Sequence, residues 1–300
     1  MPSPMVTPNK HGAVSKEVEQ IQNRRRRDHL AKLLFIAATS IAVAALMALL
    51  TNVIVDGIAS VRPELFTNYP SRRASSSGLK SALVGTILMV AIMAPIAFLL
   101  GVGAAVFLEE YAKKGVVTRL IQLNISTLAG VPSIVYGILG LTLFVRGLHL
   151  ERSLLSGSLT MTLLILPIII VSAQEAIKAV PNSRREASYA LGATKWQTVQ
   201  RSVLPSAFPG ILTGVILAVS RAIGETAPLV MIGALTYVAF LPQSILDQFT
   251  VLPIQIYNWI AKPQTDFHDL AAGGIIVLLV LLLSLNFVAI ILRNKFQKNL

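Results

Sequence analysis

Six long apolar runs limit the folds that are open to this sequence. They lie roughly at Leu33 to Val55, Ser81 to Leu108, Leu120 to Val145, Gly157 to Ile177, Phe208 to Leu235 and Leu270 to Leu292. Each has the length of about 20 residues that an α-helix needs to cross a hydrocarbon core of about 30 Å. The sequence therefore predicts an all-α membrane protein with six transmembrane helices.

The overall composition agrees with a membrane protein. Only 13% of the residues are charged and 54% are hydrophobic, whereas a soluble domain carries about a quarter charged residues. A net charge of +12 suits either nucleic acid or an anionic membrane face. Aromatic residues amount to 6% and form no base-stacking pattern, so we expect membrane lipid and no nucleic acid as the partner of these charges.

The connections between the runs predict an orientation. Most basic residues fall on the side of the N-terminus, in the tail, two loops and the C-terminus: Lys10, Lys16, Arg24 to Arg27, Lys32, Lys113, Lys114, Arg119, Lys178, Arg184, Arg185, Lys195, Arg201, Arg293, Lys295 and Lys298. The other side has fewer: Arg62, Arg72, Arg73, Lys80, Arg146, Arg152 and Lys262. Basic loops stay cytoplasmic, which predicts that both termini lie inside and that the loop 236–269 lies outside.

The first 32 residues are polar and include Arg24 to Arg27. We interpret residues 1–32 as a basic, mobile cytoplasmic tail attracted to anionic lipid, ahead of a six-span domain over residues 33–300. A secretory signal is the alternative, but the first apolar run exceeds the usual apolar region of about 7–15 residues.

The familiar sites of covalent chemistry are missing from the sequence. It has no phosphate-binding loop of the G-x-x-x-x-G-K-[ST] type, no G-x-S-x-G and no H-E-x-x-H. Without cysteine there is no disulfide or thiolate metal site, and the four histidines are scattered over the tail and loops. Glu109 and Glu110 are interpreted as the inner edge of the second helix. We therefore expect no catalytic residue, metal or cofactor, and an energy source outside this chain.

A polar segment at about residues 181–205 separates the fourth and fifth apolar runs. Ser183 and Glu186 have capping-box spacing, which predicts a short helix that stops at Gly192. Thr194 and Gln197 repeat that spacing and predict a second short helix, which Pro205 would end. Ala187 and Ala190 leave a low-relief face that fits a groove in another protein; an ordinary amphipathic loop has the same spacing.

The fifth run contains one arginine, Arg221, and one glutamate four residues later, Glu225. No other Lys or Arg lies inside the six runs. A charge in lipid costs about 2.5–3.5 kcal/mol on insertion scales and marks a functional site by default. The guanidinium fork suits a tetrahedral oxyanion, while Pro228 would expose the carbonyl of Gly224 beside it. The alternative is an ion pair that only holds helices together.

Glycine and proline are frequent in the apolar runs. Gly210 and Gly214 form a small-xxx-small pair that lets helix backbones approach closely. Pro95, Pro132, Pro167 and Pro228 would kink their helices. Kinked, glycine-rich bundles suit a moving transporter, although both residues are common in membrane helices generally.

Four motifs carry a family resemblance. E-A-S-Y-A-L-G at 186–192, followed by V-L-P at 203–205, resembles the EAA loop of ABC-importer permeases, with Ser188 in place of the second alanine. L-E-E-Y-A at 108–112, V-P-S-I-V-Y-G at 131–137 and S-R-A-I-G-E-T-A-P at 220–228 narrow the resemblance. From about Leu79 to the C-terminus the chain resembles the permease subunits of phosphate-specific importers, of the PstA type.

This resemblance implies a type I (MetI-like) permease fold in a bacterial inner membrane, and import of phosphate. It implies that the segment 181–205 couples to an ATPase through Glu186, Ala187, Ala190, Gly192 and Pro205. Translocation would involve Arg221, Glu225 and Thr226. The implied partners are a homologous permease forming a heterodimer, an ATPase dimer that hydrolyses ATP, and an extracytoplasmic phosphate-binding protein.

Three other functions stay open at this point. A permease for another oxyanion is the nearest, although sulfate has no proton for Glu225 to accept. A secondary transporter or anion channel would have no need of a docking segment. A structural or receptor protein would have little use for the charge pair.

Overall fold

The computed structural model describes residues 10–113, 115–234 and 237–298. In these ranges the regular secondary structure is helical, and the only extended pairing is an isolated bridge between Ser153 and Gln248. The chain divides into two units after Val55. An all-α fold was the prediction, and the described helices confirm it.

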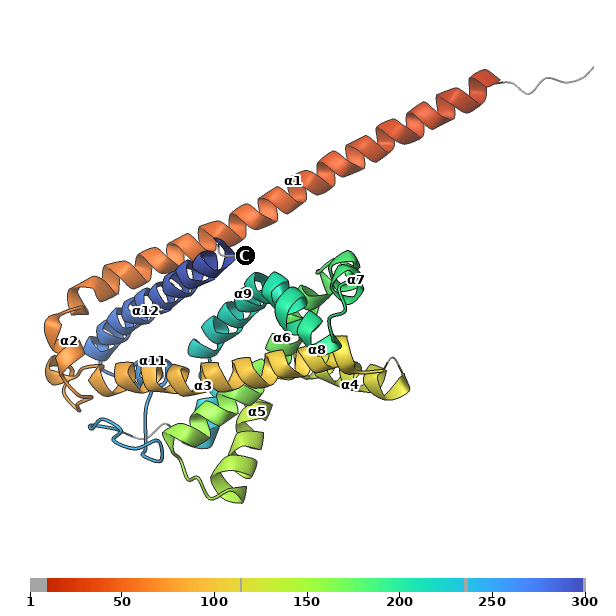
Figure 1. Ribbon diagram of the computed structural model, residues 1–300. Coiled ribbons are helices and arrows are strands. Elements are labelled where there is room, and N and C mark those ends of the chain that lie inside the picture. Colours follow the sequence, from red (N-terminus) through yellow and green to blue (C-terminus); the bar gives the residue numbers. More distant parts are fainter. Residues whose placement is uncertain (1–9, 114, 235–236, 299–300) are drawn as a thin grey trace, which may run out of the picture. The chain divides into compact units, whose positions relative to one another are not determined.

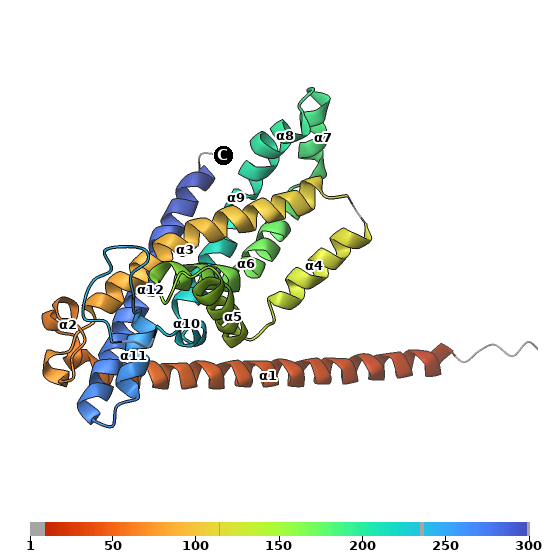
Figure 2. The same ribbon diagram turned by 90° about the horizontal axis from the view of Figure 1, so that it is seen from below.

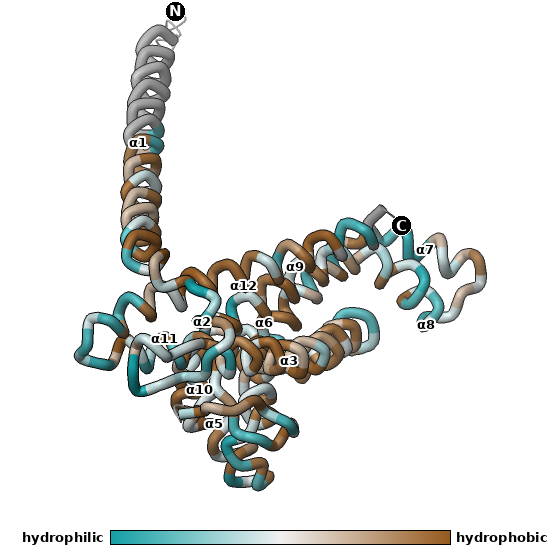
Figure 3. Tube along the Cα trace, turned by 90° about the vertical axis from the view of Figure 1, so that its left-hand side faces the viewer, coloured by the Kyte–Doolittle hydropathy of each residue, from teal (hydrophilic) through white to brown (hydrophobic). Residues whose placement is uncertain are grey.

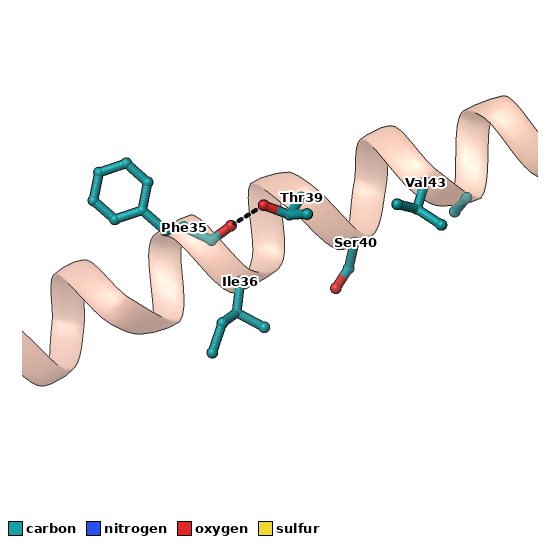
Figure 4. A pocket seen from close by; sticks show the side chains of 6 residues that line it. Phe35, Ile36, Thr39, Ser40 and Val43 are labelled. Carbon is teal, nitrogen blue, oxygen red and sulfur yellow. Dashed lines mark hydrogen bonds between the residues drawn. The ribbon is translucent and has the colours of Figure 1, made fainter. Parts of the chain in front are cut away.

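The first unit is built on one helix, α1 (Lys10–Gly57), whose residues from Ala31 onward belong to the candidate membrane span Ala31–Ser60. The first predicted span is thus confirmed. Residues 10–32, interpreted from the sequence as a mobile tail, belong to the same helix. Figure 4 shows a shallow hollow on α1 lined by Phe35, Ile36, Thr39, Ser40, Val43 and Ala44, where the Thr39 hydroxyl donates to the Phe35 carbonyl at 2.8 Å. Because all six residues come from one helix, this is surface relief and not a binding cleft.

The second unit is organised around α6 (Leu154–Lys178). This helix packs against α3 (Lys80–Val106) and α9 (Leu204–Ile223), as Figures 1 and 2 show. Ile165 and Ile169 at its centre are fully buried. A Cβ on Gly214 would lie 2.2 Å from the Ser172 hydroxyl, and one on Gly210 would lie 2.9 Å from Ala176. The predicted small-residue pair therefore does permit the close approach of α9 to α6.

The third apolar run forms two helices where the sequence predicted one. α4 (Val116–Leu128) and α5 (Ser133–Gly140), which η4 (Leu141–Gly147) continues, meet at 105°. Pro132 precedes α5, and its ring disfavours helical backbone in the residue before it. The Tyr136 hydroxyl donates to the Leu128 carbonyl at 2.8 Å across the bend. Five helices of the described chain can each cross a membrane, and this bent pair would be the sixth span.

The fifth run also differs from its prediction. The long helix runs over Lys195–Ile223 through α8 (Lys195–Thr198), the π-helical turn η5 (Val199–Val203) and α9. It ends at Gly224, and α10 (Ala227–Ile232) follows. Pro228 lies in the first turn of α10, where its missing N–H costs little. It therefore begins a helix and does not kink one, whereas Pro95 and Pro167 do lie inside α3 and α6.

Short elements gather at the two ends of the second unit (Figures 1 and 2). One end carries η1 (Ile58–Ser60), α2 (Pro63–Thr67), η2 (Ala74–Ser76) and α11 (Leu252–Ile260), where α12 (Thr265–Lys298) also begins. A second core of Leu65, Leu79, Leu252, Trp259 and Phe267 joins them.

The other end carries α7 (Asn182–Ala190), α8 and η3 (Phe107–Tyr111), which continues α3. In Figure 3 the long helices α3 and α9 are hydrophobic and α8 is hydrophilic. The described parts of two connections predicted outside, 56–80 and 237–264, thus share an end. That both termini lie inside stays a prediction.

Candidate coupling loop and ion-pair sites

The polar segment 181–205, here called the coupling loop, begins with α7. This helix starts at Asn182 behind Pro181, and no side chain caps it. The predicted capping box of Ser183 and Glu186 is therefore wrong. Because Pro181 fixes the backbone just before Asn182, the helix starts two residues earlier than a cap at Ser183 would place it. Ser183 therefore falls inside the first turn, past the capping position.

The face expected to meet a partner is exposed in the second unit. Glu186, Ala187 and Ala190 are all solvent-exposed along α7. Two large apolar side chains lie beside them, Leu191 with 89% and Trp196 with 58% of their surface exposed. The sequence analysis did not single these two out, although both flank the Gly192 turn. Exposed apolar side chains beside small residues are what a docking surface requires.

Gly192 makes the turn between α7 and α8, as predicted. Its φ of +78° is the left-handed conformation that side chains disfavour. A Cβ built there would have no neighbour within 4 Å. The left-handed backbone of the turn, and not crowding by neighbouring atoms, is therefore what favours glycine here. Thr194 then caps α8: its hydroxyl accepts from the Gln197 amide at 3.3 Å, and its own amide donates to the Gln197 side chain at 2.9 Å. The second capping box is confirmed.

Pro205 does not end this helix, contrary to the prediction. It lies in the first turn of α9, directly after the wider π turn η5, and the helix continues to Ile223. Proline is tolerated in a first turn because the N–H that it lacks would have little to bond there. Of the five predicted coupling residues, four therefore lie on α7 or in the turn that follows it, and Pro205 lies in the first turn of α9.

Arg185 anchors α7 to the rest of the unit. Its Nη2 lies 2.8 Å from Glu110 Oε1 and its Nε lies 3.1 Å from the same oxygen. Its Nη1 and Nη2 also donate to the carbonyls of Val180 at 2.7 Å and Ile177 at 3.1 Å. The Ile177 carbonyl belongs to the last turn of α6, where helix carbonyls lack partners, and Val180 lies two residues beyond the end of that helix. The side chains of Arg185 and Glu110 are 17% and 8% exposed.

Further contacts complete this anchor. Glu109 accepts from the Gln174 amide at 2.8 Å and lies 3.5 Å from the Lys178 ammonium. The Lys195 ammonium lies 5.1 Å from the centroid of the Tyr111 ring. The coupling loop is thus tied to η3 and α6 together. Sequence reasoning treated Glu109 and Glu110 only as a helix edge, because their partners lie far away in the chain.

Arg221 and Glu225 do form an ion pair, with Nε and Oε1 3.5 Å apart. The sequence predicted that this pair lies within one continuous helix, and that prediction is wrong. Arg221 is in the last turn of α9, Glu225 is in the break and Thr226 immediately precedes α10. The Arg221 and Glu225 side chains are 55% and 22% exposed. The structure brings all three predicted translocation residues to one break in a span, where backbone and side chains are both available.

The neighbourhood of this break adds one contact between spans. The Ser220 hydroxyl, next to Arg221, donates to the Asn286 side chain of α12. Across the described residues, no group of three or more His, Asp and Glu side chains could hold a metal ion. The side chains available at the break are therefore one guanidinium, one carboxylate and the hydroxyls of Ser220 and Thr226, together with the backbone.

Comparison with known proteins identifies the family. The model of the family described as "Binding-protein-dependent transport system inner membrane component" matches residues 97–300. The chain belongs to this family of membrane transport components. Its members are permease subunits of ABC importers, and the chain is accordingly a multi-pass membrane permease and not an enzyme in itself.

Relatives and solved structures of similar chains support the assignment. The permease is 32% identical to the probable ABC transporter permease protein YqgI of Bacillus subtilis, over 93% of this chain and 99% of the relative. It is 32% identical to the phosphate transport system permease protein PstA 1 of Mycobacterium tuberculosis, over 90% of each. It is 34% identical to PstA of Mycobacterium leprae, over 88% and 87%.

Two solved transporters share the fold at lower identity. A bacterial ABC transporter that imports the acidic polysaccharide alginate aligns with a TM-score of 0.62 and 15% identity, over 92% of this chain and 99% of that chain. The inward-facing MetNI methionine ABC transporter aligns with a TM-score of 0.57 and 19% identity, over 71% and 93%. The MetI-like permease fold predicted from the sequence is therefore confirmed.

Proposed function

We propose that this chain is the permease subunit of an ATP-driven phosphate importer in a bacterial inner membrane. Relatives that match about nine-tenths of the chain carry the name of phosphate transport permeases. The observation that carries the proposal within the structure is the break between α9 and α10, which holds Arg221, Glu225 and Thr226 together.

The break has the chemistry that a phosphate pathway needs. A dianion entering a medium of low dielectric constant requires a compensating charge, and the guanidinium of Arg221 supplies that charge with paired donors. Glu225 keeps the grip weak enough for release and, when ionised, accepts the proton that hydrogen phosphate carries and sulfate lacks. Thr226 adds a hydroxyl. An ion pair with 3.5 Å between its charged atoms leaves Arg221 free to exchange its partner for substrate.

The geometry disfavours a purely structural role for the pair. Arg221 and Glu225 are four residues apart in one segment, so their contact joins no two separate spans. A loose and partly exposed pair also contributes little to stability, about 0–1 kcal/mol. Holding helices together is instead the work of contacts such as Ser220 with Asn286.

In this proposal, ATP hydrolysis is coupled to transport at the N-terminal end of the long helix Lys195–Ile223, next to α7. Glu186, Ala187, Ala190 and Gly192 would dock in a groove of an ATPase subunit, with both termini on that cytoplasmic side. We infer three kinds of protein partner: a homologous permease, an ATPase in two copies and an extracytoplasmic phosphate-binding protein. The segment 181–205 and the basic residues 1–32 are both cytoplasmic in this proposal.

Reconstituted vesicles test the function. The complex is purified by a tag on this chain, the co-purifying subunits are identified, and ATP-dependent uptake of labelled phosphate is measured with sulfate as competitor. We expect an ATPase to co-purify and a tenfold excess of sulfate to leave phosphate uptake intact. Uptake without any ATPase would establish a secondary transporter, and preferred uptake of sulfate or molybdate would replace the substrate. Glu225→Gln is expected to lose flux or discrimination while the complex still assembles.

A further inference from the structure

The end of the second unit that carries α2 and α11 has a basic hollow of about 690 Å³. It is lined by Ser71, Arg72, Arg73, Ser76, Tyr237 and Lys262. Three of these side chains are cationic and the other three carry hydroxyls, so the lining contains no carboxylate. The orientation predicted from the loops places this end outside, where membrane proteins usually have few lysines and arginines.

The segment that carries the two arginines is shaped by its own hydrogen bonds. The Ser71 amide donates to the Ser77 hydroxyl at 3.0 Å, and the Arg73 amide donates to the Ser71 hydroxyl at 3.2 Å. The Ser76 hydroxyl lies 3.1 Å from that of Ser71. The Tyr237 hydroxyl, from a distant loop, donates to the Pro70 carbonyl. These bonds hold the backbone of the arginine pair in place, which lowers the entropy that a ligand must remove.

Lys262 comes to the same hollow from the connection between α11 and α12. Its ammonium lies 3.5 Å from the Ser71 carbonyl and 3.6 Å from the centroid of the Phe267 ring. Burial lowers the pKa of Lys262, which is the direction for an ammonium that has lost water without gaining a carboxylate. The nearest acidic lining belongs to a neighbouring hollow, which contains Glu64, Asp266 and Asp269 together with Arg62.

The three cations of this hollow have no carboxylate partner in the described part of the chain. Among the residues that the structure describes, Arg72, Arg73 and Lys262 form no ion pair, whereas Arg185, Lys178 and Arg221 all do. Like charges that share one hollow repel each other, and a bound anion removes that cost. Guanidinium groups and hydroxyls are also the donors that suit phosphate oxygens best.

We propose that this hollow binds the phosphate group of an oxyanion, as an outer site separate from the Arg221 break. Its use in transport, as a first station for the arriving substrate, rests on the proposed function. A phosphate group can arrive free or as the headgroup of an anionic lipid. The hollow is far larger than the roughly 30 Å³ that one water occupies, so bound phosphate keeps much of its water and binding is weak and reversible.

Binding of inorganic phosphate to the purified full chain tests this site. Equilibrium dialysis with labelled phosphate at low salt compares the wild type with Arg72→Gln/Arg73→Gln. The matched control, Arg62→Gln/Arg146→Gln, removes two arginines from the same predicted side that do not line the hollow. Losing hydrogen bonds to a charged ligand weakens binding roughly tenfold or more. We expect that loss in the first variant, and unchanged binding in the control.

Two further arms identify the source of the phosphate group and test the contribution of Lys262 to the site. Phosphatidylglycerol is added in the first arm: displacement of bound phosphate assigns the hollow to a lipid headgroup, and no displacement assigns it to free phosphate. In the second arm, a Lys262→Gln variant removes the third cation from another loop and should weaken binding as well. Wild-type affinity in both variants, or no phosphate binding by the wild type, would overturn the proposal.

Uptake by the reconstituted complex separates this inference from the proposed function. Arg72→Gln/Arg73→Gln should lower uptake at low phosphate and recover it at saturating phosphate, because an outer station matters only when capture is limiting. A wild-type complex that imports no phosphate refutes the proposed function but leaves the binding result standing. If Arg72→Gln/Arg73→Gln takes up and binds phosphate as the wild type does, the outer site is refuted and the proposed function is not.

Discussion

The chain contains two arginine–glutamate pairs that differ in almost every physical respect. Arg185 and Glu110 lie 75 residues apart, approach to 2.8 Å and are largely buried. Arg221 and Glu225 lie four residues apart, approach to 3.5 Å and leave the arginine 55% exposed. In the first pair, the arginine also donates to the backbone carbonyls of Ile177 and Val180.

We interpret this difference as that between an architectural pair and the proposed translocation pair. Removing two charges from water costs several kcal/mol per ion, and the pair repays it only with good geometry and extra hydrogen bonds. Arg185 meets that condition, so it can fix the coupling loop. Arg221 keeps access to its surroundings, which a residue that must exchange partners requires. Four substitutions test this contrast and the coupling loop that Arg185 holds. They are given in order of their expected effect on stability, from the largest to the smallest.

The largest loss of stability should come from Arg185→Ala. It leaves Glu110 buried without its partner, and breaking a buried pair in this way costs about 3–5 kcal/mol. Thermal unfolding of the purified chain in detergent measures it. Arg184→Ala is the control, since Arg184 is exposed and contacts only the Ser206 hydroxyl. Equal unfolding temperatures for the two variants would contradict the anchor. In vesicles, the complex that contains Arg185→Ala should also transport less phosphate for each ATP that its ATPase subunits hydrolyse.

Gly192→Asp should have the next largest effect, because it places a side chain in a left-handed turn. The backbone cost is about 1 kcal/mol, and no local crowding adds to it. The chain should still insert, yet transport should be abolished since a charged side chain would stand on the docking face. Uptake and ATPase co-purification check this. Gly192→Ala has the same backbone cost without the charge and should keep more activity. Normal transport by Gly192→Asp would refute the docking assignment.

Thr194→Ala should cost a similar or smaller amount. It removes the cap of α8, and losing such a cap costs about 0.5–2 kcal/mol. The anchor of Arg185 is untouched, so the loop should fray at α8 while α7 stays in place. Hydrogen exchange over residues 194–198 should rise, with no change over residues 182–190. Thr194→Ser retains the hydroxyl and should behave as wild type. Equal exchange increases in both helices would mean that the loop opens as one unit.

The smallest change in stability should come from Arg221→Ala, although its effect on flux should be complete. A partly exposed pair contributes about 0–1 kcal/mol, so unfolding and assembly should match the wild type. Phosphate uptake should be lost, and Arg221→Lys should recover only part of it because the fork is gone. Full uptake by Arg221→Ala would reduce the pair to a structural contact. A large loss of stability would instead erase the contrast with Arg185.

The sequence predicts the helical elements well because hydropathy is a local signal. It also predicts the turn at Gly192 and the cap at Thr194, which depend on a few neighbouring residues. It fails where a proline has several possible roles. Pro132 and Pro228 were interpreted as kinks but adjoin helix breaks, and Pro205 was interpreted as an end but lies in a first turn.

Other features could not be predicted because they depend on distant parts of the chain. Glu110 and Arg185 belong to separate motifs, and nothing in either motif indicates that they meet. The basic hollow likewise needs two loops that are nearly two hundred residues apart to come together. The role of Arg221 was inferred from its rarity in an apolar run, but its exposure follows from the end of α9, which hydropathy does not mark.

The unbroken helix over Lys195–Ile223 has a mechanical consequence. At about 1.5 Å per residue it is a connecting rod of about 43 Å, with the cap of the coupling loop at one end and Arg221 at the other. Pushing or twisting one end must therefore displace the other. The π turn at Val199–Val203 sets the angular phase of that rod. Since each helical residue turns the chain by about 100°, deleting one residue there would aim Arg221 at a different neighbour.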